Sequence, residues 1–165
     1  MLIFIFINFL SLLLLLLISS LTIFMNSSNE SVVVSFSPYI SKLADMLNAE
    51  EFNKAIGGER FFPELAKLQD SFMPDYITVA YGTNDWNWCS KEEVTDKLSR
   101  FLNNIMINYP NSSIVVLSPI WRKDCMEERK FGSFLEMDKI IEEQCQNRKN
   151  VSFVSGFDLV PHDEE

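Results

Sequence analysis

Two short apolar runs rich in β-branched residues place the strongest constraint on how this chain can fold. Residues 75–81 (DYITVAY) lie between Pro74 and Gly82, and residues 113–117 (SIVVL) precede Ser118. Nearly continuous apolar runs of this length are typical of strands that are covered on both faces. The sequence between them predicts an amphipathic helix, so the two strands are expected to lie parallel in one sheet.

That helix has a clear beginning in the sequence. Ser90 and Glu93 are spaced as in a capping box, where each side chain accepts a hydrogen bond from the other residue's backbone N–H. Apolar residues then recur at helical spacing as far as Tyr109, which precedes Pro110. They are Val94, Leu98, Phe101, Leu102 and Ile105.

The remaining elements continue the alternation. Helices are predicted over residues 37–47, 63–68 and 131–146, and strands over residues 51–56 and 151–154. This order predicts a parallel sheet with helices on both faces, and its ligand site is expected where the strands end. The last helix is expected to bury Phe134, Leu135, Ile140 and Ile141.

The composition argues against several kinds of site. The formal charge is −9, from 23 acidic and 14 basic residues, so a surface that binds nucleic acid is not expected. Cys89, Cys125 and Cys145 lie far apart without a CxxC pair, and His162 is the only histidine in the sequence. Neither a metal centre nor a disulfide framework is therefore predicted.

Residues 1–25 are predicted to be a separate hydrophobic segment. Leu2 to Met25 carry no charged side chain, and the run is long enough for a helix to cross a bilayer. Three interpretations are open: a membrane anchor, a signal-like segment, or sequence that is not native to this domain. A secretory signal carries a basic residue before its apolar run, whereas the first basic residue here is Lys42. The protein is expected to be membrane-anchored or secreted if the segment is genuine, and cytoplasmic otherwise.

Glycines and an asparagine gather where two predicted strands end. The tetrapeptide Gly-Thr-Asn-Asp at residues 82–85 follows one strand, and Gly58 follows the strand before it. Gly58 can present a backbone N–H and Asn84 a side-chain amide, and donors of this kind stabilise the oxyanion that forms in acyl transfer. The tetrapeptide also has the composition of an ordinary turn, so both interpretations are open.

These motifs resemble those of the SGNH/GDSL ester hydrolases. Gly58 matches the glycine of that family's second block, and residues 82–85 match its third block, whose asparagine corresponds to Asn84. The resemblance to a bacterial branch of small esterases runs from about Ser37 to Glu165. It includes residues 43–50, 118–122 and 156–163.

The resemblance implies a fold and an activity. The fold is a flavodoxin-like three-layer α/β/α domain over residues 37–165, incomplete and preceded by the apolar helix. The activity is hydrolysis of acyl esters, on carbohydrates or small lipids, with no metal and no cofactor. By the same resemblance, Gly58 and Asn84 form the oxyanion hole.

The substrate cleft is predicted from residues that follow strands. These are Gly82, Asp85, Trp121 and Arg122. For Trp121 and Arg122, contact with a sugar ring or a carboxylate is one interpretation. A partly buried indole and a salt-bridged arginine is the other.

The family's nucleophile and base motifs are both absent from the sequence. Gly-Asp-Ser occurs neither near residues 24–29, where it is expected, nor elsewhere, and Ser27 and Ser28 lack the glycine of a tight turn. No Asp-x-x-His sequence occurs either, and His162 is expected to be a surface histidine. The catalytic serine and histidine are therefore unassigned. The chain is predicted to be truncated at both ends and inactive, because a serine without a base is a poor nucleophile.

The family's first strand is central in its sheet, so its loss would leave backbone groups unpaired. Each such buried group costs about 1–3 kcal/mol. Residues 26–36 are expected to be a linker or a substitute strand, because they include the β-branched run SVVVSF. Val32 to Val34 are predicted to fill part of the empty place.

The predicted function is that of an ester hydrolase by descent that is inactive in this chain. A protein of another class is the alternative: a membrane-tethered protein that binds a glycan or acyl group in the surviving cleft without cleaving it. The expected partners are a small ester or glycan, and a membrane if residues 1–25 are retained. The sequence carries no prediction of oligomeric state.

Overall fold

The computed structural model describes residues 2–7, 38–56 and 58–162. These residues form a five-stranded sheet in the order β2-β1-β3-β4-β5, in which every neighbouring pair is parallel. The predicted parallel sheet is therefore confirmed. Its strands are β1 (Leu2–Ile7), β2 (Glu50–Asn53), β3 (Tyr76–Ala80), β4 (Ser113–Leu117) and β5 (Val151–Val154).

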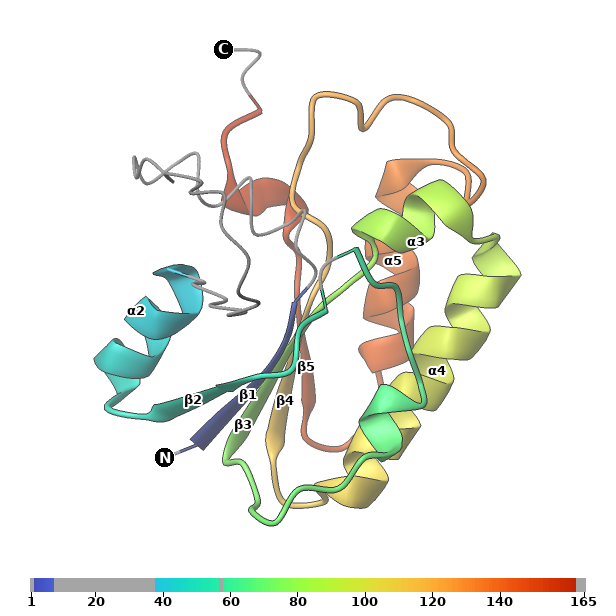
Figure 1. Ribbon diagram of the computed structural model, residues 1–165. Helices are drawn as coiled ribbons and strands as arrows, with labels where there is room; N and C mark the ends of the chain where they lie inside the picture. The colour runs from blue at the N-terminus through green and yellow to red at the C-terminus, as the bar shows by residue number, and fades with distance from the viewer. Residues whose placement is uncertain (1, 8–37, 57, 163–165) are drawn as a thin grey trace, which may run out of the picture.

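Helices cover both faces of the sheet. Figure 1 shows α4 (Lys91–Asn108) and α5 (Phe134–Cys145) on one face and α2 (Pro38–Leu47) on the other. This is the predicted three-layer α/β/α arrangement, and the strand order is that of flavodoxin-like folds. Three short elements complete the described part of the chain. They are η1 (Leu65–Lys67), α3 (Thr83–Trp88) and η2 (Phe157–Leu159).

The central strand comes from the start of the chain, which corrects the prediction of a single apolar helix over residues 2–25. β1 lies between β2 and β3, with Phe4 opposite Phe52 on one side and Ile77 on the other. It thus occupies the place that Val32 to Val34 were predicted to fill, although those residues themselves lie outside the described ones. An uncharged apolar run has no period that separates a buried strand from a helix, which explains the error.

The rest of the predicted hydrophobic segment, from Asn8 to Met25, and the predicted linker that follows it lie outside the described residues. Within the described ranges, none of the helices combines the length and the apolar character needed to span a bilayer.

The face under α4 holds most of the core. The capping box at its start is present: the Glu93 N–H donates to Ser90 Oγ at 3.3 Å, and the Ser90 N–H donates to Glu93 Oε2 at 2.6 Å. The five apolar residues predicted to share one side of this helix are all buried. They join one cluster with Ile77, Val79, Ile114 and Val116 of the sheet.

Helix α5 differs from its prediction in start and in face. It begins at Phe134 rather than residue 131, because Gly132 has a φ of +113° and forms an isolated bridge with Arg129. Leu135 was expected in the core but is 46% exposed, while Met137 and Cys145 are buried. The apolar side therefore advances by three and four residues from Phe134, and Leu135 lies off it.

Candidate functional site

The strand order indicates where a ligand site lies. In doubly wound sheets, ligands bind at the carboxyl ends of the strands where the strand order reverses. Here the reversal is at β1, because β2 and β3 lie on opposite sides of it. The segments after β2 and β3 contain Gly58 and Asn84, so both predicted oxyanion donors flank this point. The segment after β1 begins at Asn8 and lies outside the described residues.

Gly82 ends the turn from β3 into α3. It has a φ of +114°, and a Cβ there would lie 2.8 Å from Pro119 Cγ and 3.3 Å from Ile141 Cδ1. Only glycine combines this backbone conformation with such close packing. Gly82 is buried and shapes the turn, and its place in the substrate cleft stays a prediction.

Asn84 lies in the first turn of α3 and contacts the segment that follows Gly58. Its Nδ2 donates to the carbonyl oxygen of Glu59 at 3.0 Å, across 25 positions of sequence. The side chain is thereby held beside the residue next to Gly58. A carboxamide has two N–H donors, and this bond uses one of them. The helical start of residues 83–88 also replaces the simple-turn interpretation.

Gly58 sits in a turn closed by the Glu59 N–H, which donates to the Ile56 carbonyl at 3.2 Å. Its φ is +78°, a left-handed conformation that favours glycine. A Cβ at this position would meet no atom of the described residues within 4 Å. The residue is exposed, so the space above its backbone is open to a ligand.

Asp85 was predicted to line the cleft, but it is fully buried. It is 0% exposed, and its Oδ1 and Oδ2 accept from the Phe61 N–H at 3.1 and 3.4 Å. Burial raises the pKa of this carboxyl from 3.8 to about 6, and the Phe61 N–H and Lys97 lower it only partly. The Asp85 carboxylate therefore holds the loop after Gly58 through the backbone N–H of Phe61.

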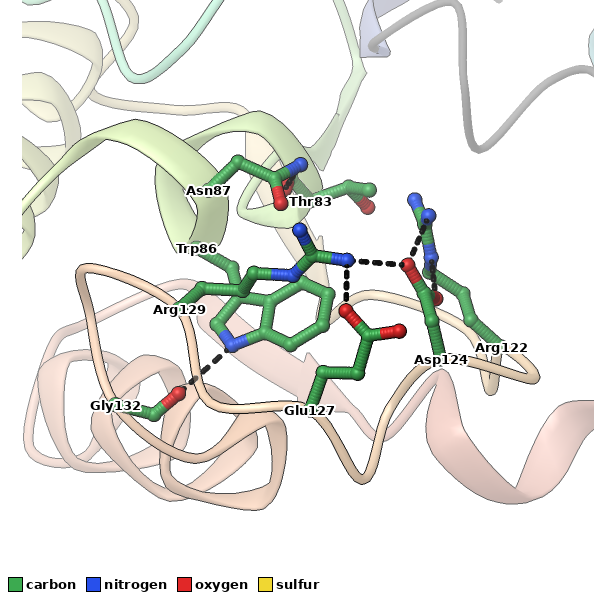
Figure 2. Close-up of polar contacts among 8 residues, drawn as sticks. All are labelled: Thr83, Trp86, Asn87, Arg122, Asp124, Glu127, Arg129 and Gly132. Carbon is green, nitrogen blue, oxygen red and sulfur yellow. Dashed lines mark hydrogen bonds and ion pairs between the residues drawn. The ribbon is translucent and has the colours of Figure 1, made fainter.

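Arg122 takes the salt-bridged alternative. Its Nε and Nη2 donate to Asp124 at 2.7 and 2.9 Å, and its Cζ lies 5.9 Å from the centre of the Trp86 ring. Figure 2 shows the second arginine of this cluster, Arg129, over the same indole at 5.2 Å. Trp86 Nε1 donates to the Gly132 carbonyl at 2.9 Å, so the loop after β4 is fastened onto α3.

Trp121 and His162 form an aromatic stack at the same end of the sheet. Their ring centres are 5.4 Å apart and the planes differ by 13°. The His162 side chain is 41% exposed, its Nε2 lies 2.8 Å from the Phe157 carbonyl, and Asp158 is 3.9 Å away. His162 is thus the predicted surface histidine. Ser27 and Ser28, the hydroxyls near the expected nucleophile position, lie outside the described residues.

A hydrogen-bonded cluster that the sequence did not reveal joins the ends of β4 and β5. Asp138 of α5 accepts from the hydroxyls of Ser118 and Ser155, the latter at 2.8 Å, and the Gly156 N–H donates to Ser118 Oγ at 2.9 Å. A Cβ on Gly156 would lie 2.1 Å from the Ser118 carbonyl oxygen. Ser118 and Gly156 follow strands, which is where the sequence predicts site residues. Asp138 lies in the middle of α5, and no local pattern in the sequence predicts its role.

Within the described ranges, no three His, Cys, Asp or Glu side chains gather in an arrangement that could hold a metal ion. The three cysteines are all buried and unpaired. The absence of a cofactor stays a prediction.

Several solved structures are similar to this chain. A carbohydrate esterase family 2 enzyme with a carbohydrate-binding domain, from Corynascus thermopiles (Myceliophthora fergusii), matches with a TM-score of 0.68 and 16% identity over 93% of this chain and 56% of that one. A family two carbohydrate esterase from Clostridium thermocellum, solved with cellohexaose, matches with a TM-score of 0.62 and 15% identity over 93% and 53%. A Bacteroides ovatus protein classed as a GDSL-like lipase matches with a TM-score of 0.63 and 16% identity over 93% and 42%.

The chain spans about half the length of these proteins. No protein-family model matches the sequence, and no curated protein does. Identities of 15–16% at these TM-scores show a shared fold. The agreement of strand order, layers and neighbours shows that the chain has the fold of the SGNH-type hydrolases, which include GDSL-like lipases and family 2 carbohydrate esterases.

Proposed function

We propose that the described residues form the oxyanion side of an SGNH-type ester-hydrolase site. The observation that carries this is the bond from Asn84 Nδ2 to the Glu59 carbonyl at 3.0 Å. It holds a carboxamide donor beside the turn that contains Gly58, at the point where the strand order reverses, and the Gly58 N–H is the second donor of the proposal. Two such donors stabilise the charge that develops on an ester carbonyl oxygen.

The substrate class is an acyl ester on a carbohydrate or a small lipid. Support comes from the similar structures, which are esterases and lipases by name, one of them solved with cellohexaose. The membrane tether of the alternative function loses support, because Leu2–Ile7 form a strand in the sheet.

The chain itself is proposed not to turn over esters. Its sequence contains neither Gly-Asp-Ser nor Asp-x-x-His. An oxyanion hole without an activated hydroxyl leaves only residual catalysis. The purified 165-residue protein is expected to hydrolyse p-nitrophenyl acetate no faster than buffer. Labelling by a fluorophosphonate would contradict this part of the proposal.

The oxyanion site is tested without catalysis. Methylphosphonate, a tetrahedral anion, is titrated into ¹⁵N-labelled protein while the Gly58 N–H and Asn84 side-chain signals are followed. Both are expected to shift together and to saturate. Asn84→Ala should abolish the Gly58 shift, whereas Asn87→Ala should keep it, because Asn87 donates only to the Thr83 carbonyl of its own helix in the described residues. Unmoved signals would sink the proposal.

Binding without cleavage is a second candidate function, and the Trp121–His162 stack favours it. His162 is exposed, whereas Trp121 is a partly buried indole that packs against the core, and aromatic rings such as these offer apolar surface to a sugar ring. Saturable binding of cellohexaose, lost in Trp121→Ala and kept in Trp88→Ala, would support a glycan-binding role. Trp88 is a suitable control because it is 68% exposed and lies on α3. Equal loss in both variants would count against it.

A further inference from the structure

Two consecutive residues of α3 hold the segment that follows Gly58 at two points. Asn84 donates to the Glu59 carbonyl at 3.0 Å, and Asp85 accepts from the Phe61 N–H at 3.1 Å. The bonds have opposite polarity, and both side chains start from the same helical turn. The backbone between Glu59 and Phe61 can therefore shift little unless one bond breaks.

The second of these bonds comes from a group that is costly to bury. Asp85 is 0% exposed and lies near an aromatic cluster of Phe61, Tyr81 and Phe101, whose rings pack 5.3–6.0 Å apart. A buried carboxylate is expensive unless it is well paired. Both of its oxygens accept from the Phe61 N–H, and the backbone N–H groups of Gly82 and Asp85 also favour its ionised form. Holding that N–H is the role that this geometry offers.

The surroundings of Asp85 make the bond sensitive to protonation. Lys97 of α4 is the cation that acts on it, while burial raises the pKa of Tyr81, with a further contribution from the negative charges of Glu59 and Asp85. The Tyr81 hydroxyl is buried and has no hydrogen-bond partner among the described residues. A protonated Asp85 would lose its charge and with it part of its strength as an acceptor.

We propose that Asp85 is the positioning residue of the oxyanion donors: its carboxylate fixes the Phe61 N–H, and so fixes the Gly58 amide relative to the Asn84 carboxamide. This inference rests on the proposed function of that pair. Asp85 acts only through the backbone and does not touch the substrate. The loop after Gly58 is the moving part, and α3 is the fixed one.

Three variants separate this role from a general effect on folding. Asp85→Asn keeps an acceptor oxygen but cannot titrate, Asp85→Ala removes the acceptor, and Asp96→Asn alters an exposed carboxylate of α4 that pairs with Arg100. The readouts are the Gly58 and Asn84 side-chain ¹⁵N–¹H signals between pH 5 and 8, and hydrogen exchange at the Phe61 amide.

In the wild-type protein the Gly58 and Asn84 signals are expected to titrate together near pH 6. Asp85→Asn should keep their positions near those of the low-pH form and remove the titration. Asp85→Ala should displace them and speed exchange of the Phe61 amide about tenfold. Asp96→Asn should leave the wild-type behaviour intact, and the β4 signals of Ile114 and Val116 should not respond in any variant.

An unchanged Gly58 signal in folded Asp85→Ala, or a titration that persists in Asp85→Asn, would overturn the inference. So would a response spread over β4, which indicates a general effect on the fold. Should the variants not fold, the wild-type titration decides: a static Gly58 signal refutes positioning. The methylphosphonate titration tests the proposed function separately, because it reports anion binding by the wild-type protein and does not depend on the role of Asp85.

Discussion

The two halves of the carboxyl edge are held together in different ways. Next to β2 and β3, side chains of α3 bond the backbone of residues 59–61, and one of those side chains is a buried carboxylate. Next to β4 and β5, the backbones themselves touch, because Gly156 leaves no room for a Cβ against the Ser118 carbonyl. The first half should therefore respond to protonation, and the second to added volume.

The largest effect is expected from adding a methyl group to the second half. Gly156→Ala would place a Cβ 2.1 Å from the Ser118 carbonyl oxygen, so backbone must move. We expect a loss of about 3 kcal/mol or more in the free energy of unfolding, measured with urea.

Gly58→Ala is the matched change in the first half. The added methyl group meets none of the described residues, so the expected loss in unfolding free energy comes from the φ of +78° alone and is about 1–2 kcal/mol. Equal losses at Gly58 and Gly156 would remove the steric side of the contrast.

The next effect is the pH dependence of the first half. Because the folded pKa of Asp85 is raised from 3.8 to about 6, its neutral form is favoured in the folded state. Stability from this group is therefore fully present below pH 4 and is lost as pH rises through 6. Relative to Asp85→Asn, the free energy of unfolding of the wild-type protein should rise by up to about 3 kcal/mol when the pH is lowered from 7 to 4. If the unfolding free energies of the two proteins, measured with urea, differed by the same amount at every pH, this prediction would be contradicted.

A smaller effect on the unfolding free energy is expected from the side-chain hydrogen bonds of the second half of the carboxyl edge, next to β4 and β5. Asp138→Ala leaves the Ser118 and Ser155 hydroxyls without their shared acceptor. We expect a loss of about 1–2 kcal/mol in unfolding free energy. Glu143→Gln, an exposed change on the same helix, should cost less than about 0.5 kcal/mol. A larger loss in Glu143→Gln than in Asp138→Ala would show that the hydrogen-bonded cluster around Asp138 contributes nothing to stability.

The smallest effect is expected at the exposed rim. His162→Ala removes the ring that stacks on Trp121 and contacts Phe157 edge-on at 4.6 Å. Since the His162 side chain is 41% exposed, the loss in unfolding free energy should stay below about 1 kcal/mol. A loss comparable to that of Gly156→Ala would mean that residues 157–162 belong to the core of the second half.

The site could be predicted only in part, because its contacts differ in sequence range. The glycines and Asn84 follow strands and stand out locally. Their partners do not: the bond from Asn84 to Glu59 spans 25 positions, and the one from Ser118 to Asp138 spans 20. Asp85 shows the limit clearly, because position after a strand suggested exposure, whereas packing against Phe61 buried it completely.

By itself, the sequence determined what depends on neighbouring residues: the capping box at Ser90, the apolar side of α4, and the alternation of strands with helices. Only the tertiary structure decided that Leu2–Ile7 form the central strand, since a uniformly apolar run suits a helix and a doubly covered strand equally. It also decided which loops meet at the carboxyl edge. Those contacts join residues far apart in the chain, and no local pattern records them.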